Sequence, residues 1–145
     1  MEIEKLYSIA DKEKIDVYNY KMQKEKARII SDETGTAIFM NYSDIGSSIE
    51  EKELITEELG HYYYSSFYSI NSPLSEISRC EYKSKKWKFL TLCPVSSFQR
   101  CFSKGLKSSY EIAEELNVSE QTVTDAYNYY VSNKLIEKED MYDFN

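Results

Sequence analysis

Apolar residues recur at two different spacings along the first third of the chain. Residues 3–13 place them at helical spacing, which predicts a short amphipathic helix. Residues 15–18 alternate apolar and polar side chains, as a short strand does. Two further strand-like runs, residues 27–30 and 36–41, flank a turn-rich cluster that ends at Gly35, so we expect a hairpin. This part of the chain therefore predicts a small antiparallel sheet beside a helix.

Longer helical patterns follow the predicted sheet. Ser47 or Ser48 can cap a helix over residues 49–67. Residues 65–75 are rich in serine and asparagine and include a proline, which predicts a loop able to lie over a cleft. A further helix is expected from about Leu74 to Leu92. The expected fold class is α+β and mostly helical, with the small sheet packed on the helix over residues 49–67.

The last part of the chain resembles a helix-turn-helix pair. Short helices are expected to begin at Ser108, with a capping-box pattern, and at Ser119, with a turn near Asn117 between them. A DNA-reading second helix would offer basic or amide side chains to a groove. This one offers mainly acidic and amide side chains, with no Arg or Lys before Lys134. We therefore expect a role in packing or in recognition of a protein.

Composition narrows the classes of function. The net charge of −7 argues against sequence-independent nucleic-acid binding, which depends on Lys and Arg neutralising phosphates. The sequence lacks an apolar run of about 18 residues, so no membrane span is expected. The N-terminus lacks the basic and apolar regions of a signal peptide, so the expected location is the cytoplasm.

The cysteines suggest no site of their own. Cys80, Cys93 and Cys101 are odd in number and lack CxxC spacing. This pattern favours neither a disulfide framework nor a cysteine-ligated zinc ion. We expect three buried free thiols.

The segment at residues 57–61 carries the candidate chemistry. On a helix, Glu57 and His61 are i and i+4, so their side chains leave one face about 5–6 Å apart. The zincin motif H-E-x-x-H aims two ligands at one zinc ion with this spacing, and its intervening glutamate is the general base. Here Glu57 stands at the first ligand position, His61 at the second, and Glu58 at the position of the base.

A catalytic zinc needs three protein ligands and one open position. Glu57 and His61 would supply two, and the best candidate for the third is Glu81 on the next helix. This set predicts one divalent metal ion. Zinc is expected. Compared with a site of two histidines and one glutamate, this set has one more carboxylate, which shifts the preference toward harder ions such as manganese.

Simpler interpretations stay open for these residues. Paired glutamates are common on exposed helix faces, and a lone histidine is often structural. Of the tyrosines that follow the motif, Tyr62 or Tyr64 could donate a hydrogen bond to a transition-state oxyanion or contact a substrate. Packing is the ordinary role for at least two of the three residues at 62–64.

The wider pattern resembles the ImmA/IrrE family of small zinc-metallopeptidase-like proteins, found on mobile elements and beside repressors in bacteria. The resemblance extends from the first helix to about Leu135. Its most specific pieces are the segment E-E-L-G-H-Y-Y at residues 57–63 and a later E-x-x-x-x-x-W-x-x-x-x-L-x-P run. That run is made by Glu81, Trp87, Leu92 and Pro94.

The resemblance implies roles for individual residues. Glu58 matches the catalytic glutamate, His61 the retained histidine ligand, and Glu81 the third ligand. Glu57 stands in place of the first histidine of the motif. Lys88 stands where relatives carry alanine. Its longer side chain could crowd the contact between the helices, or its charge could point at the site.

The resemblance also implies a function. It predicts a metal-dependent endopeptidase that cleaves a helix-turn-helix repressor or a similar regulator by limited proteolysis. The alternative is an inactive relative that binds the regulator without cutting it. The implied organisation is a metallopeptidase-like domain at residues 1–104, a helix-turn-helix-like extension at 105–136, and an acidic tail at 137–145.

Overall fold

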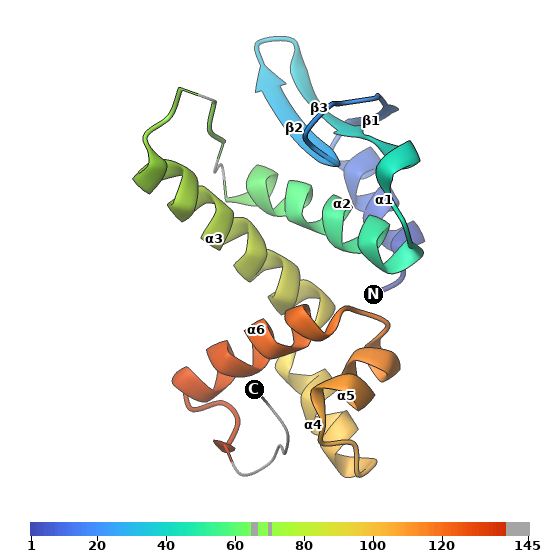
Figure 1. Cartoon of the computed structure of the whole chain (residues 1–145), viewed down its shortest axis with the longest axis vertical. Helices are drawn as coiled ribbons and strands as arrows, with labels where there is room; N and C mark the ends of the chain where they lie inside the picture. Colours follow the sequence, from blue (N-terminus) through green and yellow to red (C-terminus); the bar gives the residue numbers. More distant parts are fainter. Residues whose placement is uncertain (65–66, 70, 139–145) are drawn as a thin grey trace. The chain divides into compact units, whose positions relative to one another are not determined.

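The computed structural model describes residues 1–64, 67–69 and 71–138 (Figure 1). Within them the chain is α+β and mostly helical, as predicted. The helices are α1 (Ile3–Lys12), α2 (Ser48–Tyr63), α3 (Leu74–Leu92), α4 (Val95–Ser103), α5 (Ser109–Leu116) and α6 (Glu120–Ser132). The strands are β1 (Asp16–Asn19), β2 (Ala27–Asp32) and β3 (Gly35–Met40), followed by the 3-10 turn η1 (Tyr42–Asp44). The chain divides into two compact units, Met1–Lys88 and Phe89–Asn145.

The sheet of the first unit is mixed, with strand order β1-β3-β2. The predicted hairpin is confirmed, because β2 and β3 pair antiparallel and Gly35 supplies the positive φ (139°) at its turn. The prediction of an antiparallel sheet is wrong for β1, which pairs parallel to β3. The chain reverses once between β1 and β2 and again at the hairpin, so β3 regains the direction of β1 and lies between the other two strands.

Helix α2 packs against β2, β3 and α1 (Figure 1). Ile55 and Leu59 of α2, Leu6 of α1 and Ile38 of β3 are all fully buried. Since one face of the helix covers the sheet, the residues beside Ile55 and Leu59 are held in fixed directions. This packing positions the motif at residues 57–61.

The ends of α2 agree only in part with the sequence. Ser47 is its N-cap, with the side-chain oxygen accepting a hydrogen bond from the Glu50 backbone N–H at 3.1 Å. The predicted extension to residue 67 is wrong, because α2 ends at Tyr63 and Phe67 lies outside any helix. Helix α3 covers the predicted residues, Leu74–Leu92.

The second unit is built from the end of α3 with α4, α5 and α6. Phe98 lies 5.7 Å from Tyr130, ring centroid to ring centroid, and the Tyr130 hydroxyl donates to the Cys93 carbonyl at 2.8 Å. The first contact ties α4 to α6, and the second ties α6 to the turn between α3 and α4. Of the expected acidic tail at 137–145, only residues 137 and 138 belong to the described part of the chain.

Helices α5 and α6 are joined by a short turn. Asn117 ends α5 in the left-handed conformation, with φ 55° and ψ 53°, which asparagine tolerates better than most residues. Ser119 then caps α6 by accepting from the Thr122 backbone N–H at 3.2 Å. Ile112, Val118 and Val123 around this turn are buried. The start and turn signals read from the sequence therefore match the observed helices.

Replacing Ser108 by alanine is expected to cost about 1 kcal/mol of stability. Ser108 accepts from the Glu111 backbone N–H at 3.1 Å and donates to the Glu111 carboxylate at 2.9 Å, and alanine loses both bonds. The urea unfolding midpoint of the full chain measures the loss. Ser108→Asp is the control, because it keeps a capping acceptor and should stay near wild type. Equal midpoints for alanine and wild type would contradict the capping role.

The three cysteines are free and buried, as the sequence predicted. Cys93 and Cys101 are almost fully inaccessible, and Cys80 is 7% exposed. No helix in the described part of the chain is long and apolar enough to cross a membrane.

Candidate active site

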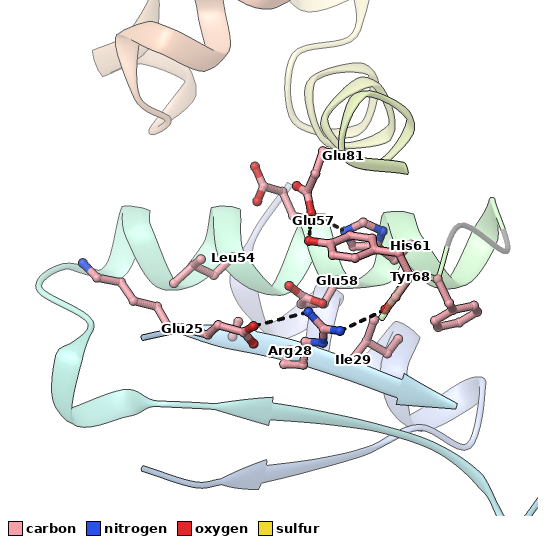
Figure 2. Close-up of a pocket in the computed structure, with 12 residues that line it drawn as sticks. Glu25, Arg28, Ile29, Leu54, Glu57, Glu58, His61, Tyr68 and Glu81 are labelled. Carbon is pink, nitrogen blue, oxygen red and sulfur yellow. Dashed lines mark hydrogen bonds and ion pairs between the residues drawn. The ribbon is translucent and has the colours of Figure 1, made fainter. Parts of the chain in front are cut away.

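A cavity of about 230 Å³ opens in the first unit, between β2, α2, α3 and the segment after α2 (Figure 2). Its lining includes all four residues that the sequence singled out as ligands or catalyst. These are Glu57, Glu58, His61 and Glu81. Figure 2 shows Glu58 directed from α2 toward β2, while Glu81 extends from α3 toward His61. The fold therefore gathers residues from separate helices at one pocket.

His61 of α2 and Glu81 of α3 face each other across the pocket. The His61 Nε2 lies 3.6 Å from the Glu81 Oε1, and His61 is only 6% exposed. The Glu81 carboxylate also accepts a hydrogen bond from the Tyr68 hydroxyl. The interaction with His61, followed by that with Tyr68, holds the pKa of Glu81 below its ordinary value. Glu81 is therefore an anion that faces the histidine.

Glu58 lies in a different environment from Glu81. It is 8% exposed, and its burial raises its pKa to about 7. The neighbouring His61 opposes this rise, while the nearby carboxylates of Glu57 and Glu81 add to it. A carboxyl group whose pKa is near neutrality can both accept and release a proton at physiological pH. The two carboxyl groups beside His61 therefore differ in pKa: that of Glu58 is raised and that of Glu81 is lowered.

Glu57 is turned toward Lys88 of α3. The Lys88 Nζ lies 2.6 Å from the Glu57 Oε1 and 3.6 Å from the Glu53 Oε1. Lys88 is only 9% exposed, so its ammonium group lies largely out of water between two carboxylates. The sequence raised the possibility that this lysine points its charge at the site, and in the structure it pairs with the first predicted ligand.

The donor set fits a divalent metal in part. The imidazole of His61 and the carboxylate of Glu81 are donor types that zinc and manganese both accept. The Glu57 carboxylate is held by Lys88 and is not free to join them. Among residues 1–64, 67–69 and 71–138, no group of three His, Cys, Asp or Glu side chains is placed to hold a metal ion. The three-ligand set therefore stays a prediction.

The two helices approach closely at Gly60. A Cβ atom there would lie 2.9 Å from the Ser84 carbonyl oxygen and 3.1 Å from the Trp87 Cβ. Ser84 is fully buried, so a small residue is needed on each helix. This contact falls between the Glu57–Lys88 pair and the His61–Glu81 pair along α2, and it sets the distance across which both pairs form.

The tyrosines after the motif lie elsewhere. The Tyr62 hydroxyl donates to the Glu13 carboxylate at 3.1 Å, and the Tyr63 ring stacks on Trp87 with centroids 5.2 Å apart. Tyr64 is 37% exposed. Neither Tyr62 nor Tyr64 belongs to the described lining of the pocket, so their suggested contact with a transition state has no geometric support here.

Two residues at the pocket were missed from the sequence. Tyr68 lies against His61, with ring centroids 5.9 Å apart, and bonds to Glu81. Arg28 of β2 donates to the Tyr68 carbonyl at 2.9 Å and lies 5.0 Å from its ring centroid. The loop prediction for residues 65–75 was the available signal for Tyr68. A lone arginine in a strand pattern gives no comparable signal.

Comparisons with protein-family models, curated proteins and solved structures found no match to this chain. The resemblance to the ImmA/IrrE family therefore stays a prediction that rests on the motif residues.

Proposed function

We propose that this chain is a metal-dependent endopeptidase of the ImmA/IrrE type that cleaves a helix-turn-helix repressor or a similar regulator by limited proteolysis. One observation carries the proposal: a buried carboxyl of raised pKa, Glu58, lies in one pocket with the His61–Glu81 pair. A proton carrier beside two donor side chains supplies the general base and part of the ligand set that metal-assisted peptide hydrolysis uses.

The residues of the pocket would have separate roles in peptide hydrolysis. His61 and Glu81 would hold the metal, and Tyr68 would orient Glu81 through its hydroxyl. Lewis-acid polarisation of the scissile carbonyl is the chemistry that such an ion supplies when bound. Glu58 would accept a proton from the attacking water and return it to the leaving amine. Burial supports this role, because it brings the pKa of Glu58 to about 7.

The position of β2 supports a peptide as the substrate. β2 is an outer strand of the sheet and pairs with β3 on its inner side. Ala27, Arg28 and Ile29 of β2 line the pocket. An outer strand offers backbone groups to an extended segment, which is a common mode of peptide recognition. A flexible segment of a regulator could therefore bind beside β2 with a peptide bond near Glu58.

A second candidate function is favoured by the Glu57–Lys88 ion pair. If that pair persists, Glu57 is not available as a metal ligand, and the chain binds the regulator through the same pocket without cutting it.

Direct DNA binding is not part of either proposal. On α6 the Gln121 amide donates to Asp125 at 2.9 Å, so the side chain best suited to read a base is engaged within its own helix.

The metal requirement is tested on the purified chain. We expect one zinc or manganese ion per chain after incubation with the metal and desalting, measured by elemental analysis. His61→Ala and Glu81→Ala should each lose the ion, because each removes a donor of the proposed set. Glu33→Gln, on the exposed hairpin turn, should retain it. Absence of metal from the wild-type chain at every ion tested would exclude the metallopeptidase.

Cleavage separates the two candidate functions. The probe is a purified helix-turn-helix repressor, taken from the genes that neighbour the gene for this chain where one of them encodes such a protein. Glu58→Gln is expected to reduce the cleavage rate by at least about 100-fold and to leave binding of the repressor intact, because only proton transfer is lost. Binding without cleavage by the metal-loaded wild type would favour the non-catalytic role.

A further inference from the structure

The Glu57–Lys88 ion pair and the His61–Glu81 contact both join α2 to α3. Glu57 and His61 are one turn apart on α2, and their partners Lys88 and Glu81 are two turns apart on α3. The Gly60 contact with Ser84 lies between these two interactions. The close approach of the backbones at Gly60 therefore brings Lys88 within reach of Glu57 and Glu81 within reach of His61.

Lys88 and a metal ion would compete for the same carboxylate group, that of Glu57. The side chains of Lys88, Glu57 and Glu53 are 11%, 21% and 12% exposed, so the three charges are mostly shielded from water. Removing one partner from such a buried pair leaves an uncompensated charge. A metal ion that recruited Glu57 would have to displace the ammonium group into a region with little access to solvent.

We propose that Lys88 is an internal counter-ion that suppresses metal binding by keeping Glu57 out of the ligand set. The inference rests on the proposed function, because the site in question is the one formed with His61 and Glu81. The resting chain then offers two donors to a metal. Loss or displacement of the Lys88 charge releases Glu57 as the third.

Isothermal titration of the full, chelator-treated chain with Zn²⁺ and with Mn²⁺ tests this inference. Lys88→Ala should tighten metal binding by at least about tenfold relative to wild type, the scale on which groups around a metal site act. The gain should disappear in the double variant Lys88→Ala, Glu57→Gln, because it depends on the released carboxylate. Lys83→Ala removes an equal charge from an exposed position of α3 and should leave the affinity within about twofold of wild type.

The outcomes separate this inference from the proposed function. Tighter binding by Lys88→Ala that needs Glu57 supports the inference, even if the wild-type chain binds no metal and the metallopeptidase proposal falls. Equal affinity of Lys88→Ala and wild type overturns the inference and leaves the metallopeptidase intact if both bind. Failure of both chains to bind overturns both proposals. Should Lys88→Ala not fold, Lys88→Met keeps the apolar stem and is held to the same outcomes.

Discussion

Replacing Gly60 by alanine is expected to destabilise the chain by about 1–3 kcal/mol. The added Cβ would lie 2.9 Å from the Ser84 carbonyl oxygen, 3.0 Å from the Ser84 Cα and 3.1 Å from the Trp87 Cβ. Two of these atoms belong to the backbone of α3 and cannot rotate away. In an open helix position the same substitution would stabilise by up to about 1 kcal/mol, so the contact reverses the ordinary sign.

The urea unfolding midpoint of the full chain measures this effect. Gly46→Ala, in the segment before α2, is the control for adding a methyl group where there is room, because a Cβ there meets no described atom within 4 Å. We expect the control to stay near wild type or above it. A Gly60→Ala chain as stable as the control would show that α2 and α3 do not approach as closely as the structure has them.

The same substitution also bears on the site. Moving α3 away from α2 would lengthen both the His61–Glu81 and the Glu57–Lys88 distances, since both span that contact. In a Glu57→Gln background, where displacement of Lys88 releases no ligand, any metal affinity that depends on His61 and Glu81 should therefore fall on Gly60→Ala substitution under conditions where the variant is still folded.

Glu58→Gln is expected to change how stability depends on pH. Burial raises the pKa of Glu58 from its ordinary value of 4.5 to about 7, so the folded chain binds this proton more tightly than the unfolded chain. Between these two values the wild-type chain should lose up to about 3 kcal/mol as pH rises, because the buried group must ionise. The uncharged amide avoids this loss.

The comparison is made as unfolding free energy from pH 4 to pH 8 in the presence of a chelator. At pH 8 the Glu58→Gln chain should be more stable than wild type by about 2–3 kcal/mol, and near pH 4 the two should be similar. Glu81 acts with the opposite sign, since its pKa is lowered, but it is present in both chains. Glu33→Gln is the exposed control and should follow the wild-type curve. Parallel curves for wild type and Glu58→Gln would mean that Glu58 is not a buried acid of raised pKa.

The elements could largely be predicted because their signals are local. Helical spacing, the capping serines Ser47, Ser108 and Ser119, and the turn before Gly35 act within a few residues of each other. The helix Leu74–Leu92 follows from such signals alone. The overlong prediction for α2 shows the limit of this approach, since apolar spacing continued past Tyr63 after the helix had ended.

The placement of the candidate residues was also predictable in part. Spacing put Glu57, Glu58 and His61 on one helix, and motif order pointed to Glu81 on the next. All four line one pocket. The sequence alone determined which residues share an element and which of its faces they occupy, since the helical period decides this without reference to the rest of the chain.

Only the tertiary structure decided what those residues meet. It placed β3 between β1 and β2, turned Lys88 toward Glu57, and brought Tyr68 to Glu81. Each of these contacts joins segments that are distant in sequence or separated by a loop, and no local pattern encodes their distance. Burial, which raises the pKa of Glu58, likewise depends on packing against β2. The physical reason is that charge pairing and desolvation depend on separations of a few ångströms between elements, and these are set only when the helices and the sheet pack together.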